Sequence, residues 1–178
     1  MHDAAELAGF AIRAARSPGE LAECARMMAG SEPWLTLQRS PGVCLQLCSN
    51  PTKEVYLAAA GARILGFLIL DLTGPFPGYL QTVCVAPEAR GRGVGSQLIG
   101  FAEQRIFRDS PNVFLCVSSF NSAARRLYQR LGYETVGVLK GYLVAEHDEI
   151  LLRKSLGAWR GFRGGAAAAK LEPPAAER

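Results

Sequence analysis

The chain has 178 residues, of which 49% are hydrophobic, and a net charge of +4. This length and composition suit one domain with a substantial core. The basic residues are spread along the chain, which argues against a nucleic-acid groove, and no apolar stretch is long enough to span a membrane. The five cysteines form neither a CxxC pair nor a Cys/His metal pattern, so we expect no metal site and a reducing, cytoplasmic setting.

The first half of the chain predicts a strand, two short helices and a hairpin. Ser17, followed by Pro18 and by Glu20 in the first turn, is typical of a helix N-cap. Two aliphatic runs separated by a glycine-containing turn are typical of a β-hairpin. The elements are expected at residues 10–15 (strand), 21–28 and 34–38 (helices), and 54–60 with 63–72 (hairpin strands).

The second half of the chain alternates strands with helices. Val94, Leu98, Ala102 and Ile106 recur at every fourth position, which predicts a helix with one buried face. Asn121 is a suitable N-cap for the next helix. The expected elements are strands at 79–86 and 113–118, helices at 92–107 and 121–131, and a final strand pair at 134–139 and 148–154, joined by residues 141–147.

The order of these elements, β-α-α-β-β-β-α-β-α-β-β, predicts an α+β or mixed α/β domain over residues 1–156. From Gly157 onward the composition changes to glycine, alanine, arginine and proline, which cannot bury a core. Residues 157–178 are therefore expected to form a flexible tail.

A glycine-rich turn, Arg90-Gly91-Arg92-Gly93-Val94-Gly95-Ser96, joins a predicted strand to the start of a predicted helix. Unpaired N–H groups and the positive end of the helix dipole favour an anion at such a place. The turn lacks the third glycine of the dinucleotide fingerprint and the lysine ending of a P-loop. By itself it is consistent with an unspecified anion site or with a glycine-rich connection that binds nothing.

Two segments together resemble the GNAT (GCN5-related N-acetyltransferase) family. Arg90, Gly93 and Gly95 occupy the positions of its acyl-CoA motif, Arg/Gln-x-x-Gly-x-Gly/Ala, within residues 83–98. Residues 121–133 are similar to its second motif, Asn-x-x-Ala-x-x-Leu-Tyr-x-x-x-Gly-Phe/Tyr. The spacing between the two motifs is that of the family, and the pattern is similar to the branch that acetylates the N-terminal alanine of a ribosomal protein.

The resemblance implies a fold, a reaction and a pair of substrates. The fold would be a mixed, mostly antiparallel sheet of six to seven strands with splayed central strands, flanked by about four helices. The reaction would be direct attack of a primary amine on acetyl-CoA through a tetrahedral intermediate. The acceptor would be a small molecule, a peptide or a protein, and the enzyme a monomer or homodimer.

The family motifs also imply site residues. The backbone of Val83, Cys84 and Val85 would hold the pantetheine arm and polarise the thioester carbonyl. Asn121 would contact the cofactor arm, although its place as a helix cap explains it equally well. Tyr128 would protonate the departing thiolate as general acid, or else be a core tyrosine. The implied cofactor-binding residues are Val83, Cys84, Val85, Arg90, Gly91, Arg92, Gly93, Val94, Gly95, Ser96, Asn121 and Tyr128.

The residue that accepts the proton of the amine is left open by the sequence. The ribosomal-protein branch has a glutamate five residues before the motif asparagine, where this chain has Cys116. A buried strand cysteine is an inert thiol in most proteins. The other candidates for the base are Glu32, Asp71, Glu146, His147 and Glu149.

Two residues near the N-terminus are candidates for reading the acceptor. Glu32 and Trp34 occur where the early helices of the family line the acceptor pocket, and an ordinary cap and a core aromatic explain them equally well.

The missing glutamate motivates an alternative function, a CoA-binding sensor or regulatory module without turnover. A third reading, a nucleic-acid binder, would rest on Arg160 and Arg163 beside Trp159 and Phe162, and it predicts salt-sensitive binding.

Overall fold

The computed structural model describes residues 9–164, and the contacts among them form two compact units. Unit 1 takes residues 9–70 and 82–102, and unit 2 takes residues 71–81 and 103–164. Strand β4 (Tyr79–Val85) begins in unit 2 and ends in unit 1. The single domain expected over residues 1–156 stays a prediction, and residues 165–178 of the expected tail lie outside the described residues.

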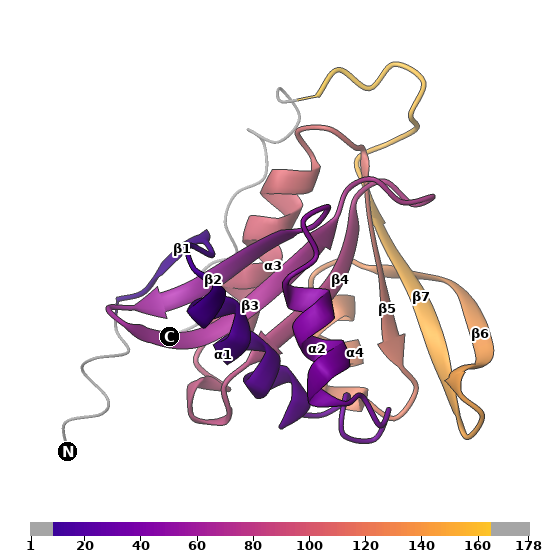
Figure 1. Cartoon of the computed structure of the whole chain (residues 1–178). Coiled ribbons are helices and arrows are strands. Elements are labelled where there is room, and N and C mark those ends of the chain that lie inside the picture. Colours follow the sequence, from indigo (N-terminus) through magenta and orange to yellow (C-terminus); the bar gives the residue numbers. More distant parts are fainter. Residues whose placement is uncertain (1–8, 165–178) are drawn as a thin grey trace. The chain divides into compact units, whose positions relative to one another are not determined.

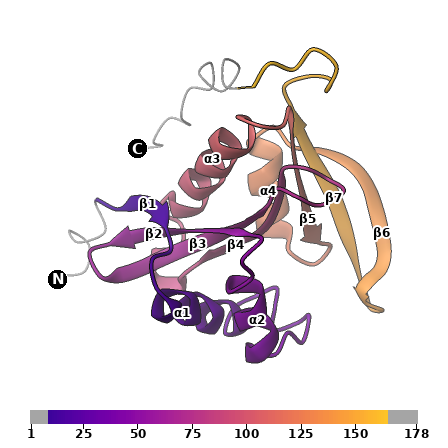
Figure 2. The same ribbon diagram turned by 45° about the horizontal axis from the view of Figure 1, so that its top comes forward.

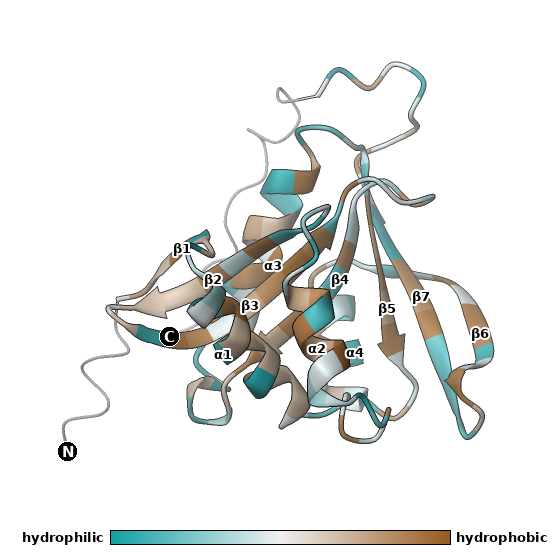
Figure 3. Cartoon of the chain, viewed as in Figure 1, coloured by the Kyte–Doolittle hydropathy of each residue, from teal (hydrophilic) through white to brown (hydrophobic). Residues whose placement is uncertain are grey.

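Four strands form the sheet of unit 1 in the order β1-β2-β3-β4 (Figure 1). Both β1 (Ala11–Ala14) and β3 (Arg63–Asp71) pair antiparallel with β2 (Glu54–Ala60). The hairpin of β2 and β3 is the predicted one, and its turn contains Gly61 with a φ of 60°. β3 is hydrophobic along most of its length (Figure 3), and its residues from Ile64 to Leu70 are all buried. Such a strand needs cover on both faces.

Helices provide that cover, as Figure 2 shows: α1 (Pro18–Ala29) and α2 (Pro41–Cys48) lie on one face of these strands, and α3 (Val94–Ile106) lies on the other. The core beneath α1 and α2 is unusually rich in thiols, all of them buried and free. Burial raises the pKa of Cys48 and Cys84 to about 12, so these thiols stay protonated and act as small apolar side chains. The four cysteines of this core are Cys24, Cys44, Cys48 and Cys84.

The prediction of a helix over residues 34–38 is wrong, because these residues form turns and α2 begins only at Pro41. Ser40 caps α2 through its hydroxyl, which accepts a hydrogen bond from the Val43 backbone at 3.3 Å. Proline is tolerated at the first helical position because the backbone N–H that it lacks would have no helical partner there. A serine–proline pair therefore starts α2 as it starts α1.

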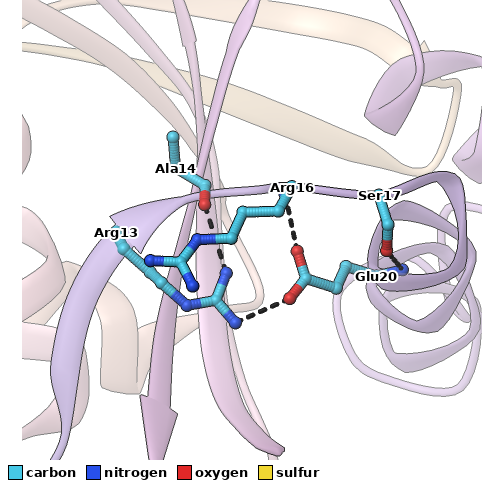
Figure 4. Close-up of polar contacts among 5 residues, drawn as sticks. All are labelled: Arg13, Ala14, Arg16, Ser17 and Glu20. Atoms are coloured by element: carbon cyan, nitrogen blue, oxygen red, sulfur yellow. Dashed lines mark hydrogen bonds and ion pairs between the residues drawn. The ribbon is translucent and has the colours of Figure 1, made fainter.

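A polar network holds the junction between β1 and α1 (Figure 4). Ser17 is the N-cap, as predicted, and its hydroxyl accepts a hydrogen bond from the Glu20 backbone at 3.3 Å. The Glu20 carboxylate accepts hydrogen bonds from the Arg13 guanidinium and from the Arg16 backbone N–H, both at 2.6 Å. These two bonds, that from Arg13 first, lower the pKa of Glu20 to about 2.

This lowered pKa predicts a pH-dependent contribution to stability. An unfolded glutamate has a pKa of about 4.3, so the contribution of Glu20 is fully present above that pH and is lost as the pH falls toward 2. We expect Glu20→Gln to lower the melting temperature near neutral pH, and to lose less stability than the wild type on acidification. Thermal unfolding followed by circular dichroism measures both, with Glu23→Gln in the same helix as the control. An identical acid dependence in wild type and Glu20→Gln would contradict the prediction.

Unit 2 continues the strand order as β4-β5-β7-β6. β5 (Asn112–Ser118) pairs antiparallel with β7 (His147–Ser155) along its whole length. β4 and β5 pair in parallel, with Tyr79 opposite Phe114. The described chain thus has a seven-stranded mixed sheet and four α-helices, which confirms the predicted fold class. The splay expected between β4 and β5 stays a prediction.

The last hairpin is longer than predicted, because β6 (Glu134–Val144) continues through the residues expected to form a connection. Gly141, with a φ of 52°, lies where the pairing with β7 shifts between Leu139 and Val144. The Asp148 carboxylate accepts a hydrogen bond from the Gly141 backbone at 3.0 Å. A glycine that suggested a break in the sequence is instead accommodated within the strand as an irregularity of the ladder.

Candidate active site

The last part of β4, in unit 1, contains the segment expected to hold the pantetheine arm. Cys84 is buried, whereas Val83 and Val85 on either side are half-buried. Cys84 belongs to the thiol-rich core, and burial outweighs a hydrogen bond with Ser31 in setting the raised pKa of its thiol. The side chain of Cys84 is therefore a core side chain, as expected, and only its backbone could serve a ligand.

The turn after β4 presents open backbone. Gly91 and Gly93 have φ values of 71° and 78°, in the left-handed region that side chains rarely adopt. Apart from its two chain neighbours, no atom of residues 9–164 lies within 4 Å of the place where a Cβ of Gly91 would stand. For Gly93 the nearest atom is the Gln97 side-chain nitrogen, at 4.0 Å. Both glycines thus leave room for a group that binds against the backbone.

Helix α3 follows this turn directly. The Gln97 backbone N–H donates to the Gly93 carbonyl at 3.0 Å, which closes the first helical turn. The amides of Val94, Gly95 and Ser96 come before that bond, so they are donors without a helical partner. The positive end of the α3 dipole adds to their attraction for an anion.

Two arginines flank the turn. Arg90 Nε donates to the Val85 carbonyl at 3.2 Å, which ties the turn back to the end of β4. Arg92 is exposed. Open backbone, amide donors and two guanidinium groups are what a pyrophosphate needs, because charge-assisted hydrogen bonds to phosphate are the strong ones. Residues 90–96 therefore offer donors that suit the pyrophosphate of a CoA cofactor.

The other two residues of the family motifs lie in unit 2, on helix α4 (Ser122–Arg130). Asn121 caps α4 through Oδ1, which accepts a hydrogen bond from the Ala124 backbone at 3.2 Å. Tyr128 is on the buried side of α4, where its ring contacts Tyr133 edge to face at 5.5 Å between centroids. Burial raises the pKa of Tyr128 to about 12, so its hydroxyl keeps its proton at physiological pH.

A buried polar cluster in unit 2 brings together four residues that the sequence separates. The Ser118 hydroxyl donates to Glu149 Oε1 at 2.6 Å, and both side chains are buried. Cys116 and Tyr79 hydrogen-bond to each other through their side chains. Burial raises the pKa of both groups and the charge of Glu149 adds to this effect, so the Cys116 thiol gives up its proton less readily than a free cysteine.

Three further sequence candidates, Glu32, Trp34 and Asp71, have local structural roles. Glu32 accepts a hydrogen bond from the Thr36 backbone at 3.3 Å, and Trp34 packs against the core of unit 1. Asp71 accepts hydrogen bonds from the backbone and hydroxyl of Thr73. These contacts agree with the cap and the core aromatic that the sequence allowed, and a substrate role for Glu32 and Trp34 stays a prediction.

Two further properties concern the described residues as a whole. Across residues 9–164, every helix is too short or too polar to traverse a lipid bilayer. In the same range, no three His, Cys, Asp or Glu side chains are placed so that they could hold a metal ion.

Comparison with known proteins agrees with this reading. The chain is 28% identical over 137 residues to the N-alpha-acetyltransferase RimI of Mycobacterium tuberculosis, covering 75% of this chain and 82% of RimI. It is 39% identical over 127 residues to the mycothiol acetyltransferase of Mycobacterium leprae strain Br4923, covering 67% of this chain. That match spans only 38% of the mycothiol acetyltransferase.

A solved structure shows the same fold. The ribosomal-protein-S18-alanine N-acetyltransferase from Escherichia coli superposes with a TM-score of 0.68 at 16% identity, covering 84% of this chain and 96% of that one. The family model described as "Acetyltransferase (GNAT) family" matches residues 8–133, which include both predicted motifs. Because that match covers more than half of the sequence and the fold agrees with it, the chain belongs to the acetyltransferase (GNAT) family.

Proposed function

We propose that this protein transfers the acetyl group of acetyl-CoA to a primary amine, as a monomer or homodimer in a reducing, cytoplasmic setting. The observation that carries the proposal is the open glycine turn between β4 and α3, where Gly91 and Gly93 have positive φ and room at their Cβ positions, and where the first helical hydrogen bond is that from Gln97 to Gly93. Five free thiols support the reducing setting.

Each motif residue has a role in this proposal. Acetyl-CoA supplies the thioester that the amine attacks. Residues 90–96 bind the pyrophosphate, the backbone of Val83–Val85 holds the pantetheine arm, and Asn121 donates to that arm through the amide NH2 that its cap leaves unused. The buried, protonated hydroxyl of Tyr128 donates a proton to the departing thiolate, which makes that group a better leaving group.

We propose an α-amine as the acceptor, in a peptide or a small molecule. The α-amino group has a reference pKa of about 7.8, whereas that of lysine is about 10.4, so the α-amine loses its proton more readily near pH 7. The name of the relative RimI describes an N-alpha-acetyltransferase, which supports the same class of amine.

The second candidate function is a CoA-binding sensor without turnover. The observation that favours it is Cys116, a half-buried protonated thiol at the position of the glutamate in the ribosomal-protein branch. In this case the glycine turn would bind CoA and no acceptor would be acetylated.

The test measures transfer and binding separately. Release of CoA is followed with acetyl-CoA and a panel containing an alanine-initiated peptide, a lysine peptide with a blocked N-terminus and small primary amines. We expect transfer, with the alanine-initiated peptide preferred over the lysine peptide. Tight binding of CoA with no transfer to any amine would contradict the acetyltransferase proposal and favour a CoA-binding sensor.

A matched pair of variants tests the glycine turn. Gly91→Val places a side chain in the open position, and we expect it to weaken CoA binding about 10-fold or more, measured by calorimetry. Gly61→Val is the control, because Gly61 also has positive φ and open surroundings but lies in the β2–β3 turn. Equal CoA affinity in the two variants would show that the glycine turn does not contact the cofactor.

A further inference from the structure

The sheet of unit 2 contains a buried carboxylate whose role in the reaction neither motif assigns. Glu149 lies on β7 opposite Ser118 of β5, and its side chain is buried. Removing a carboxylate from water is costly, and clusters of buried ionisable groups occur preferentially at functional sites. Glu149 is one of five candidates for the base that the sequence left open.

The neighbours of Glu149 can move a proton. The Ser118 hydroxyl donates to Oε1 at 2.6 Å, the short distance typical of a hydroxyl bound to a carboxylate. Tyr79 from β4 and Cys116 from β5 are near enough for the charge of Glu149 to act on both. On β6, Leu139 pairs with Glu149. His147, two residues earlier on β7, packs its ring against that of Phe120 in a tilted arrangement, with 4.6 Å between the ring centroids.

The four residues of this cluster differ in how far they are buried. Glu149 and Ser118 are buried, whereas Tyr79 and Cys116 are half-buried. Tyr79 and Cys116 are thus the more exposed members of the cluster, and the residue that carries the carboxylate is more buried. A base held in this way is shielded from bulk water and can still be reached through hydrogen-bonded groups.

A second buried carboxylate of unit 2, that of Glu103, accepts a hydrogen bond from the Lys154 ammonium at 2.7 Å. The Ser118 hydroxyl that binds Glu149 differs from an ammonium, because a neutral hydroxyl can take up one proton as it gives another.

We propose that Glu149 takes the proton of the acceptor amine, through the Ser118 hydroxyl, as the base of the acetyl transfer. The proposal rests on the proposed function. The ammonium form of the acceptor gives one proton, directly or through water, to the Ser118 oxygen, while the Ser118 hydroxyl proton passes to Glu149 Oε1. The nitrogen lone pair then forms the C–N bond to the thioester carbon, which gives the tetrahedral intermediate. As this intermediate collapses the C–S bond breaks and the thiolate takes the proton of Tyr128, while the second proton of the nitrogen passes through water to restore the Tyr128 hydroxyl. Serine is unchanged, and Glu149 later releases its proton to water.

The first test is the pH profile of Glu149→Gln, with acetyl-CoA and the alanine-initiated peptide. We expect kcat/KM near pH 7 to fall about 100-fold, the usual contribution of a general base. The deficit should shrink above pH about 8, because an α-amine with a pKa of about 7.8 then loses its proton unaided. Ser118→Ala should show the same pH dependence with a smaller loss, and it tests the relay even if Glu149→Gln does not fold.

Glu103→Gln is the matched control. It removes another buried carboxylate of unit 2, so we expect lower stability and an unchanged pH profile. A profile that changes equally in Glu103→Gln would assign the effect to general damage and overturn the role of Glu149. A wild-type profile in Glu149→Gln or in Ser118→Ala would also overturn it.

A second readout does not depend on turnover. Since the charge of Glu149 raises the pKa of Cys116, Glu149→Gln should speed alkylation of Cys116 by iodoacetamide near pH 8, measured by peptide mass spectrometry. An unchanged rate would show that no charge acts on the thiol and would contradict the cluster. If the wild type acetylates no amine, the proposed function is wrong whatever the alkylation shows. If the wild type acetylates an amine and Glu149→Gln has the same pH profile, only the role of Glu149 as the base is wrong.

Discussion

Replacing Tyr128 with phenylalanine is expected to lower kcat for acetyl transfer by about 100-fold, with little change in the melting temperature. The substitution deletes one hydroxyl and keeps the ring that contacts Tyr133. Because burial raises the pKa of Tyr128 to about 12, the wild-type hydroxyl stays protonated throughout the working range of pH. The wild-type kcat should therefore show no fall from ionisation of this tyrosine below pH about 11. Steady-state kinetics from neutral to alkaline pH measure both effects.

Tyr133→Phe is the control for this result. Tyr133 is the ring partner of Tyr128 and is buried in the same unit, but the motif gives it no proton to transfer. We expect Tyr133→Phe to keep the wild-type kcat. If Tyr128→Phe also keeps it, Tyr128 is a core tyrosine and the thiolate is protonated by another group.

Replacing Gly78 with alanine is expected to destabilise the protein by about 3 kcal/mol or more. Gly78 precedes β4 with a φ of 93°, and an added Cβ would clash with the Asn112 carbonyl and lie 2.6 Å from the Ile106 side chain. The Gly78 carbonyl also accepts a hydrogen bond from the Phe114 backbone at 3.0 Å, beside the pairing of β4 with β5. The backbone cannot move away from the clash without stretching that bond. Equilibrium denaturation in urea measures the loss.

The alanine variant of Gly61 separates strain from crowding. Gly61 also has positive φ, but in the described part of the chain no atom beyond its two neighbours lies within 4 Å of its Cβ position. Gly61→Ala should therefore cost only about 1 kcal/mol, from backbone strain alone. Equal losses in the two variants would show that the close approach at Gly78 contributes nothing.

The elements of this fold that were predictable from sequence have local causes. The N-cap at Ser17 and the cap at Asn121 were recognisable because each satisfies backbone groups within a few residues. The glycine turn and α3 were recognisable because the sequence shows them directly. Glycines adopt positive φ readily, and apolar residues at every fourth position mark the buried face of a helix. Proline and glycine are less decisive signals, because each occurs both at breaks and within helices or strands. Pro41 begins α2, and Gly141 lies within β6.

The sequence by itself determined the family and the cofactor half of the proposed site, because those residues act through backbone in two short, contiguous motifs. Only the tertiary structure shows the hydrogen bond from Ser118 to Glu149 on which the proposed proton relay rests. Ser118 and Glu149 are 31 residues apart, and neither segment contains a sequence pattern that predicts their contact. The antiparallel register of β5 and β7 places them opposite each other, and the parallel start of β4 adds Tyr79 beside Cys116. Such a cluster depends on strand pairing, which is set by the burial of whole sheet faces rather than by local pattern.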